Sequence, residues 1–140
     1  MQVHWVYPYD KLRAANVLAT LTVIELASAG KQKSIAFVSS TATLEAPHYV
    51  QLSDRLADTK QRGVPESDDL EGALSSLKTG YGQTKWVSEK LLREAGRRGL
   101  RGHIIRPGYV VGDSKSASGY YLFATHNLQG LTSNNSNQYG

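Results

Sequence analysis

The chain has 140 residues, a length typical of one domain, and 40% apolar and 20% charged residues, the balance of an ordinary globular protein. It contains no cysteine, which excludes disulfide scaffolds, Cys-based zinc sites, iron–sulfur clusters and thiol nucleophiles, and we expect no metal site. No apolar run reaches the ~18 residues of a membrane-spanning helix, and the segment Met1–Tyr9 is too short and too polar for a signal peptide. We therefore expect a cytoplasmic protein without a membrane partner.

The net charge of +4 comes from 16 Lys and Arg against 12 Asp and Glu. Much of the excess lies in a group of arginines near the end of an expected helix: Arg93, Arg97, Arg98, Arg101 and Arg106. Such a group can bind phosphate or nucleic acid. A solvated helix end is the more common explanation, because cations favour the C-terminal turn, where the helix macrodipole is negative. We therefore expect no nucleic-acid partner.

The first expected elements are a helix and a strand. Apolar residues recur at three and four residues over 10–29, which predicts an amphipathic helix. Asp10 is a suitable N-cap, Pro8 stands just before it, and Gly30 follows the helix end. The short apolar run 34–39, rich in Ile, Phe and Val, predicts a buried strand.

The second half repeats this order. The polar segment 41–71 reads as a long irregular loop. A helix is expected over 81–98, ended by Gly99, and a second buried strand over 103–105. Strands that alternate with helices predict an α/β fold with a parallel sheet.

The composition changes at Ser114. Residues 114–140 carry only one charged side chain, Lys115, and end in an Asn- and Ser-rich stretch without helical or strand periodicity. We interpret residues 1–113 as the folded domain and 114–140 as a divergent, poorly ordered tail.

One glycine string invites a nucleotide-binding interpretation. Gly96–Gly102 fits G-x-x-G-x-x-G, but it follows a helix and leads into a strand. A dinucleotide fingerprint does the reverse, so that amides at a helix N-terminus face the pyrophosphate. The string is better explained as a helix terminator, and the chain contains no other candidate fingerprint.

Tyr81 and Lys85 are four residues apart, which places both side chains on one face of a helix. A nearby ammonium favours tyrosinate, so we expect a lowered pKa for the phenol and a better acid. The spacing alone is weak evidence, and a pair of surface residues is the more common explanation. Tyr7-x-x-x-Lys11 has the same spacing, but Pro8 is expected to keep Tyr7 outside the helix.

Two further motifs follow the expected strands. Ser39-Ser40-Thr41 comes directly after the first, where a hydroxyl cluster could bind a reacting carbonyl, or could be a plain turn. Arg106-Pro107-Gly108 comes after the second, and its backbone could approach a ligand closely.

Taken in order, these motifs resemble the extended short-chain dehydrogenase/reductase family. The resemblance is strongest to the thioester-reductase domains of carboxylic acid reductases, above all those of the fungal L-2-aminoadipate reductases. Five motifs at family spacing carry it, and they lie within residues 3–20, 37–44, 63–70, 79–90 and 98–115.

The resemblance implies a partial Rossmann-type parallel sheet with flanking helices and NADPH-dependent reduction of an acyl thioester on a phosphopantetheine arm to an aldehyde. It makes Thr41 the carbonyl-binding hydroxyl, Tyr81 the proton donor, and Lys85 the residue that tunes Tyr81 and binds the nicotinamide ribose. It gives Asn16 a supporting role. The implied NADP-binding backbone comprises Pro107, Gly108, Tyr109 and Val110.

The chain also departs from the family. The first βαβ nucleotide-binding half, with its glycine loop, is missing, and the resemblance ends after Lys115. We therefore expect a segment of a larger reductase that is inactive alone and that can self-associate through an exposed sheet edge. Two alternatives remain open: a nucleotide-sugar epimerase or dehydratase of the same superfamily, and a catalytically inactive binding module.

Overall fold

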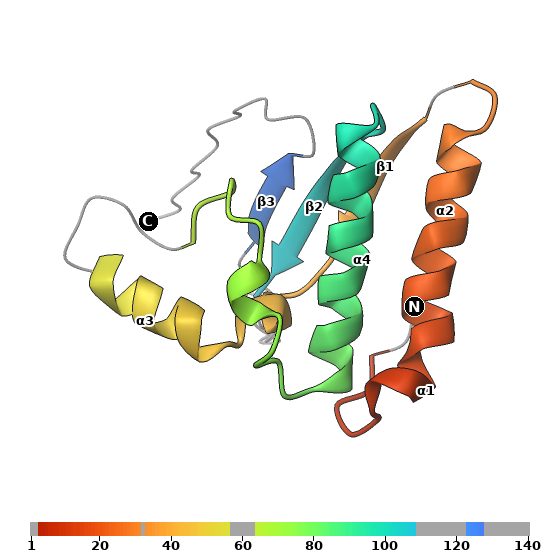
Figure 1. Cartoon of the computed structure of the whole chain (residues 1–140). Coiled ribbons are helices and arrows are strands. Elements are labelled where there is room, and N and C mark those ends of the chain that lie inside the picture. Colours follow the sequence, from red (N-terminus) through yellow and green to blue (C-terminus); the bar gives the residue numbers. More distant parts are fainter. Residues whose placement is uncertain (1–2, 32, 57–63, 109–122, 128–140) are drawn as a thin grey trace, which may run out of the picture.

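The computed structural model describes residues 3–31, 33–56, 64–108 and 123–127. Its centre is a three-stranded sheet in the order β1-β2-β3, with two long helices packed side by side against one face (Figure 1). This arrangement confirms the predicted α/β class. None of the helices in the described ranges is long and apolar enough to cross a membrane.

The first helical stretch runs through α1 (Tyr9–Arg13), one π-helical turn η1 (Ala14–Leu18) and α2 (Ala19–Ser28). The predicted helix is therefore confirmed, but the assignment of Asp10 as its cap is wrong. Pro8 occupies the N-cap position and makes no side-chain capping bond. Asp10 lies in the first turn instead, where its charge still favours the positive helix end.

β1 (Ser34–Val38) and β2 (Arg101–Pro107) pair in parallel, from Ser34 opposite Arg101 to Val38 opposite Ile105. The parallel pairing is as predicted. The expected burial of the first strand holds for one face only, because its residues alternate between exposed and buried and Val38 is 55% exposed. The described helices cover only one face of the sheet, so only Ile35 and Phe37 of β1 reach the core.

Within the segment expected to lack regular structure, β3 (Phe123–Asn127) pairs antiparallel with β2. The expectation was therefore wrong for these five residues. Backbone pairing along a strand edge needs neither side-chain periodicity nor charged residues, so neither feature of the segment indicated this strand. The other residues of 114–140 lie outside the described part of the chain.

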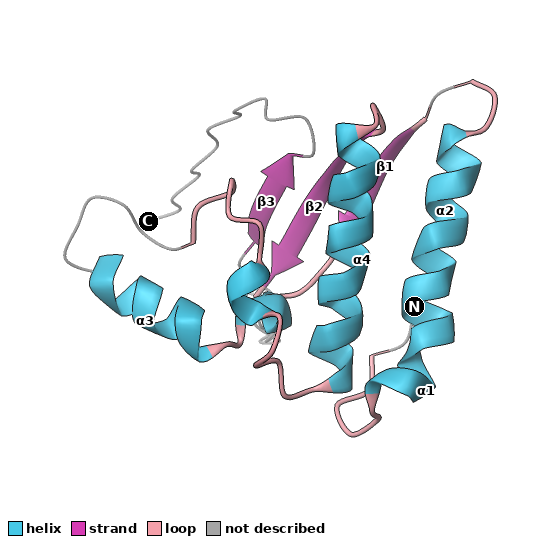
Figure 2. Cartoon of the chain, in the orientation of Figure 1, coloured by secondary structure: helices cyan, strands magenta, loops and turns pink. Residues whose placement is uncertain are grey.

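The segment 41–71 is more regular than expected. It contains a 3₁₀ turn η2 (Thr41–Leu44), the helix α3 (Pro47–Leu56) and a second 3₁₀ turn η3 (Glu71–Ala73) (Figure 2). A small apolar cluster organises it, made of Ala46, Tyr49, Leu70, Ala73 and Leu77. The cluster is divided between residues 46–49 and 70–77, and each half alone is too short to produce a sustained periodic pattern.

The second long helix, α4 (Gly80–Arg97), begins at Thr79, whose hydroxyl accepts a hydrogen bond from the amide of Gly82. It ends at Gly99, which has a φ of +99°, while the amide of Leu100 bonds back to the carbonyl of Ala95. This is a Schellman motif, so the glycine string is a helix terminator as expected.

The arginine group divides into two parts. Arg97 and Arg98 are exposed and pair with Glu94, and Arg101 is exposed, as expected for a solvated helix end. The expectation was wrong for Arg106, which is buried in the sheet and paired with Glu89. Alternation along β2 turns Arg106 toward the same face as Ile104, a placement that depends on the strand pairing.

Candidate active site

A cavity of about 320 Å³ opens at the carboxyl ends of β1 and β2. Its lining comes from segments that are far apart in the sequence: Val3, Trp5, Ser39, Ser40, Thr41, Glu45, Tyr81, Pro107 and Gly108. The structure thus brings Thr41 and Tyr81 together with Pro107 and Gly108. Tyr109 and Val110, the other two predicted cofactor-binding residues, lie outside the described residues.

The hydroxyl loop directly extends the parallel sheet. The amide of Ser39 donates to the carbonyl of Ile105 at 2.6 Å, which continues the β1–β2 ladder by one residue. Ser40 then caps η2, because its hydroxyl accepts from the amide of Ala42 at 3.1 Å. This sharp change from strand to 3₁₀ turn presents Thr41 to the cavity.

Two glycines on either side of Tyr81 allow close backbone approaches. A Cβ at Gly80 would lie 2.4 Å from the carbonyl oxygen of Tyr7. A Cβ at Gly82 would lie 2.9 Å from the carbonyl oxygen of Ala42. The start of α4 is thereby pressed between the N-terminal segment and η2, so that Tyr81 faces both. Sequence inspection missed this role, although a glycine on each side of a candidate catalytic tyrosine is a usable signal.

The Tyr81 ring is 6% exposed, and Trp5 packs on it at a tilt, with ring centroids 5.6 Å apart. Burial raises the pKa of the Tyr81 phenol, and a hydrogen bond with Ser40 opposes that rise in pKa. The expectation of a lowered phenol pKa is therefore wrong for this structure. The cost of desolvating a phenolate outweighs the stabilisation that its neighbours provide.

Lys85 lies one helical turn beyond Tyr81 and is 2% exposed. Its Nζ donates to the carbonyl of Val38 at 2.6 Å and sits 5.0 Å from the Phe37 ring centroid and 5.6 Å from that of Tyr81. Burial lowers the pKa of Lys85 to about 8, although the carboxylate of Glu89 opposes the decrease. Lys85 thus lies beside the tyrosine, under the end of β1.

Asn16 is buried in the π-helical turn and joins the first helical stretch to α4. Its side-chain amide donates to the hydroxyl of Thr84 at 3.1 Å, and its backbone carbonyl accepts from the hydroxyls of Thr20 and Ser88. Side-chain donors that compete for a helix carbonyl are a common cause of local widening. The structure therefore places Asn16 against Thr84 and Ser88 of α4. Its supporting role stays a prediction.

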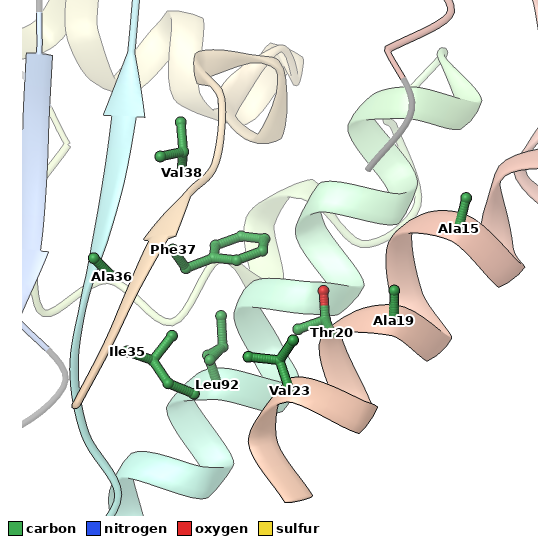
Figure 3. Close-up of a pocket in the computed structure, with 9 residues that line it drawn as sticks. All are labelled: Ala15, Ala19, Thr20, Val23, Ile35, Ala36, Phe37, Val38 and Leu92. Carbon is green, nitrogen blue, oxygen red and sulfur yellow. The ribbon is translucent and has the colours of Figure 1, made fainter. Parts of the chain in front are cut away.

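A second hollow, of about 390 Å³, runs between β1 and the first helical stretch (Figure 3). Thr20 contributes the polar side chain of this lining, and the other residues are apolar, including Val23, Ile35, Phe37 and Leu92. Without ionisable groups, this hollow offers packing surface and no acid–base chemistry.

Comparison with known proteins gives the family. The model of the NAD-binding family described as male sterility protein matches residues 2–133. The chain belongs to this family. The male sterility protein family consists of NAD(P)-binding domains, so a nicotinamide dinucleotide is the cofactor class at family level.

Individual relatives agree with the resemblance drawn from the motifs. The chain is 57% identical to an L-2-aminoadipate reductase of Schizosaccharomyces pombe over 116 residues, and 57% identical to the L-2-aminoadipate reductase large subunit of Candida glabrata over 116 residues. Each match covers 83% of this chain and 8% of the relative.

A solved structure, the terminal R domain from the myxalamid PKS-NRPS biosynthetic pathway, matches 81% of this chain and 26% of its own chain, with 42% identity and a TM-score of 0.66. The predicted resemblance to fungal L-2-aminoadipate reductases and reductase domains is therefore confirmed. The chain spans less than a tenth of the two curated relatives and about a quarter of the R-domain chain.

Proposed function

We propose that this chain supplies the catalytic residues of an NADP-dependent reductase that converts a carrier-bound acyl thioester to an aldehyde. The observation that supports the proposal most directly is the shared cavity of Thr41 and Tyr81, with Lys85 one helical turn below. The relatives named as L-2-aminoadipate reductases and the R domain of a PKS-NRPS pathway favour this reaction class.

The residues at the cavity suit the nicotinamide half of the cofactor. Pro107 and Gly108 line the cavity together with the two hydroxyl-bearing residues, and the buried ammonium of Lys85 lies 5.6 Å from the ring centroid of Tyr81. In the described ranges, no strand leads through a glycine turn into a helix that could hold the pyrophosphate. When bound, NADPH supplies the hydride that adds to the thioester carbonyl.

The protein side of the reaction follows from the two hydroxyls. Thr41 and Tyr81 donate hydrogen bonds to the carbonyl oxygen, where negative charge develops as the hydride arrives. A raised pKa keeps the Tyr81 phenol protonated, so it can deliver its proton to that oxygen. The resulting hemithioacetal then collapses to the aldehyde and releases the carrier thiol.

The test uses a full-length reductase that contains this segment. NADPH oxidation is followed with a carrier-bound or coenzyme A thioester, and nucleotide sugars serve as alternative substrates. Tyr81→Phe should reduce kcat about 100-fold, the contribution typical of a positioned general acid. Tyr7→Phe is the matched control, because Tyr7 lies before α1 and is partly exposed. Equal kcat for Tyr81→Phe and the wild type would remove Tyr81 from the mechanism, and turnover of a nucleotide sugar alone would overturn the proposed reaction.

A further inference from the structure

Glu89 is the most enclosed charged side chain near the cavity. It lies on α4 one turn beyond Lys85 and is 0% exposed. Its carboxylate accepts two hydrogen bonds from Arg106, at 2.9 Å from Nε and 2.6 Å from Nη2. Arg106 itself is 6% exposed, so the pair is almost completely removed from water.

The same carboxylate also holds two hydroxyls of the loop after β1. Ser39 Oγ donates to Glu89 Oε1 at 2.5 Å, and Thr43 Oγ1 lies 3.5 Å from the same oxygen. Thr43 Oγ1 also donates to the carbonyl of Ser40 at 3.0 Å. Glu89 therefore fastens both ends of the short turn that contains Ser40 and Thr41.

This turn carries the groups that face the cavity. Ser40 bonds to the Tyr81 phenol and accepts from the amide of Ala42, and Thr41 lines the cavity. Neither Glu89 nor Thr43 is part of that lining. Both act on the site only through the turn that they hold.

A role in stability alone explains this arrangement poorly. The free energy needed to remove two charges from water can equal the free energy of their attraction, so a buried ion pair is weak evidence for stabilisation. The carboxylate does provide the acceptor for the buried hydroxyl of Ser39. Its position therefore suits the shaping of the turn better than it suits the support of the core.

We propose that Glu89 is a positioning residue of the reductase site: held by Arg106, it anchors Ser39 and Thr43 so that Ser40 and Thr41 meet Tyr81. The proposal rests on the proposed function for its effect on turnover. The charged groups around this carboxylate are Lys85 on its own helix, Arg93 one turn further along, and Arg106 on β2.

The first test measures the turn itself in the chain 1–140, independently of activity. Glu89→Gln keeps the side-chain shape and weakens the acceptor. Amide exchange at Ala42 and Thr43 should become about tenfold faster, the consequence of losing roughly one hydrogen bond of stabilisation. Glu94→Gln is the matched control, because it makes the same change on the same helix at a carboxylate that pairs only with exposed arginines.

The second test measures turnover in a full-length reductase that contains this segment. Glu89→Gln should lower kcat about tenfold and leave KM for the thioester within about twofold, since an acceptor outside the cavity affects the reacting geometry more than binding. Glu94→Gln should leave both constants unchanged. If the wild-type enzyme does not reduce thioesters, the proposed function fails, and the exchange rates still decide whether Glu89 holds the turn.

Thr43→Val covers the case in which Glu89→Gln does not fold. It removes the hydroxyl that donates to the carbonyl of Ser40 and that lies 3.5 Å from Glu89, and it leaves the Glu89–Arg106 pair intact. Faster amide exchange at Ala42 together with a several-fold lower kcat supports the positioning role. Wild-type exchange and wild-type kcat in the folded variants would overturn it.

Discussion

At the scale of single residues, Lys85 has a pKa well below that of a lysine in water. Its ammonium is almost fully buried, and its Nζ rests on the carbonyl of Val38. Burial disfavours the charged form more than the carboxylate of Glu89 favours it, which is why the pKa of Lys85 decreases from 10.5 to about 8. An amine with a pKa in this range can exchange a proton near neutral pH.

The lowered pKa predicts how stability depends on pH. Between pH 8 and 10.5 the unfolded chain retains a proton that the native lysine has released, so the free energy of unfolding should rise with pH in this window. The rise should be on the order of 2 kcal/mol by pH 9.5, at 1.36 kcal/mol per pKa unit. Tyr49 and Tyr81 have raised pKa values, so they act in the opposite direction only above about pH 10.

Urea unfolding of the chain 1–140 at pH 7, 8.5 and 9.5 measures this dependence. Lys85→Met should remove the rise, because the variant has no buried amine to titrate. Lys78→Met alters an exposed lysine and should keep the rise. A rise of the same size in Lys85→Met would assign the pH dependence to another group.

At the scale of elements, the N-terminus of α4 forms a close junction with two other segments of the chain. The backbone of residues 7–9 crosses it at Gly80, and η2 crosses it at Gly82. Any side chain at Gly80 must displace backbone atoms, which cannot rotate away as a flexible side chain can. The junction therefore sets where Tyr81 lies relative to Trp5 and Thr41.

Gly80→Ala should destabilise the chain by about 2–3 kcal/mol, because its Cβ would lie 2.4–2.5 Å from backbone atoms of residues 7–9. Gly30→Ala is the control. Its Cβ would meet no atom within 4 Å, and only the φ of +62° opposes it, at a cost of about 1 kcal/mol. Denaturant unfolding compares the two variants, and the emission of Trp5 should change in Gly80→Ala alone. Equal losses in both variants would contradict the close approach.

At the scale of the whole molecule, the sheet has an exposed edge. Among the described strands β1 pairs only with β2, and its other edge borders the apolar hollow of Figure 3. Several apolar side chains beside this edge are exposed, including Val23 and Val38. Unpaired strand edges with apolar neighbours recruit other strands.

We therefore expect the chain 1–140 to self-associate through the edge of β1. Val38→Lys should shift the weight-average mass in sedimentation equilibrium toward the monomer, because a charge on an edge strand opposes pairing. Val50→Lys is the matched control, since Val50 is 56% exposed on α3, away from the sheet edge. The expectation is wrong if the wild-type mass does not increase with concentration.

The chain 1–140 should also bind NADPH weakly, with a Kd no tighter than about 1 mM, or roughly −4 kcal/mol. Among the described residues, the contacts that we expect are with the nicotinamide half, through Lys85 and the backbone at Pro107 and Gly108. Calorimetric titration of the folded chain checks this expectation. Micromolar binding would point to a phosphate site elsewhere, and Arg97→Ala with Arg98→Ala would then be the first variants to examine.

The sequence by itself determined the two long helices, the parallel strands and the order of the motifs. These features depend on local signals: helical periodicity up to Ser28, a glycine after each of the two long helices, and short β-branched runs. The motif that contains Thr41 was a candidate because ligands bind beyond the carboxyl ends of parallel strands, and Tyr81 was a candidate because of its spacing to Lys85. Their catalytic roles were implied by the family resemblance.

Only the tertiary structure decided the environments of these residues. The raised pKa of Tyr81, the buried Lys85 and the anchoring by Glu89 depend on burial and on contacts between residues far apart in the sequence, such as Glu89 and Thr43, which are 46 positions apart. Such contacts produce no periodic pattern in the sequence, because each depends on how β1 and α4 pack. Local residue types therefore indicated which groups could react, and packing determined their charge, orientation and partners.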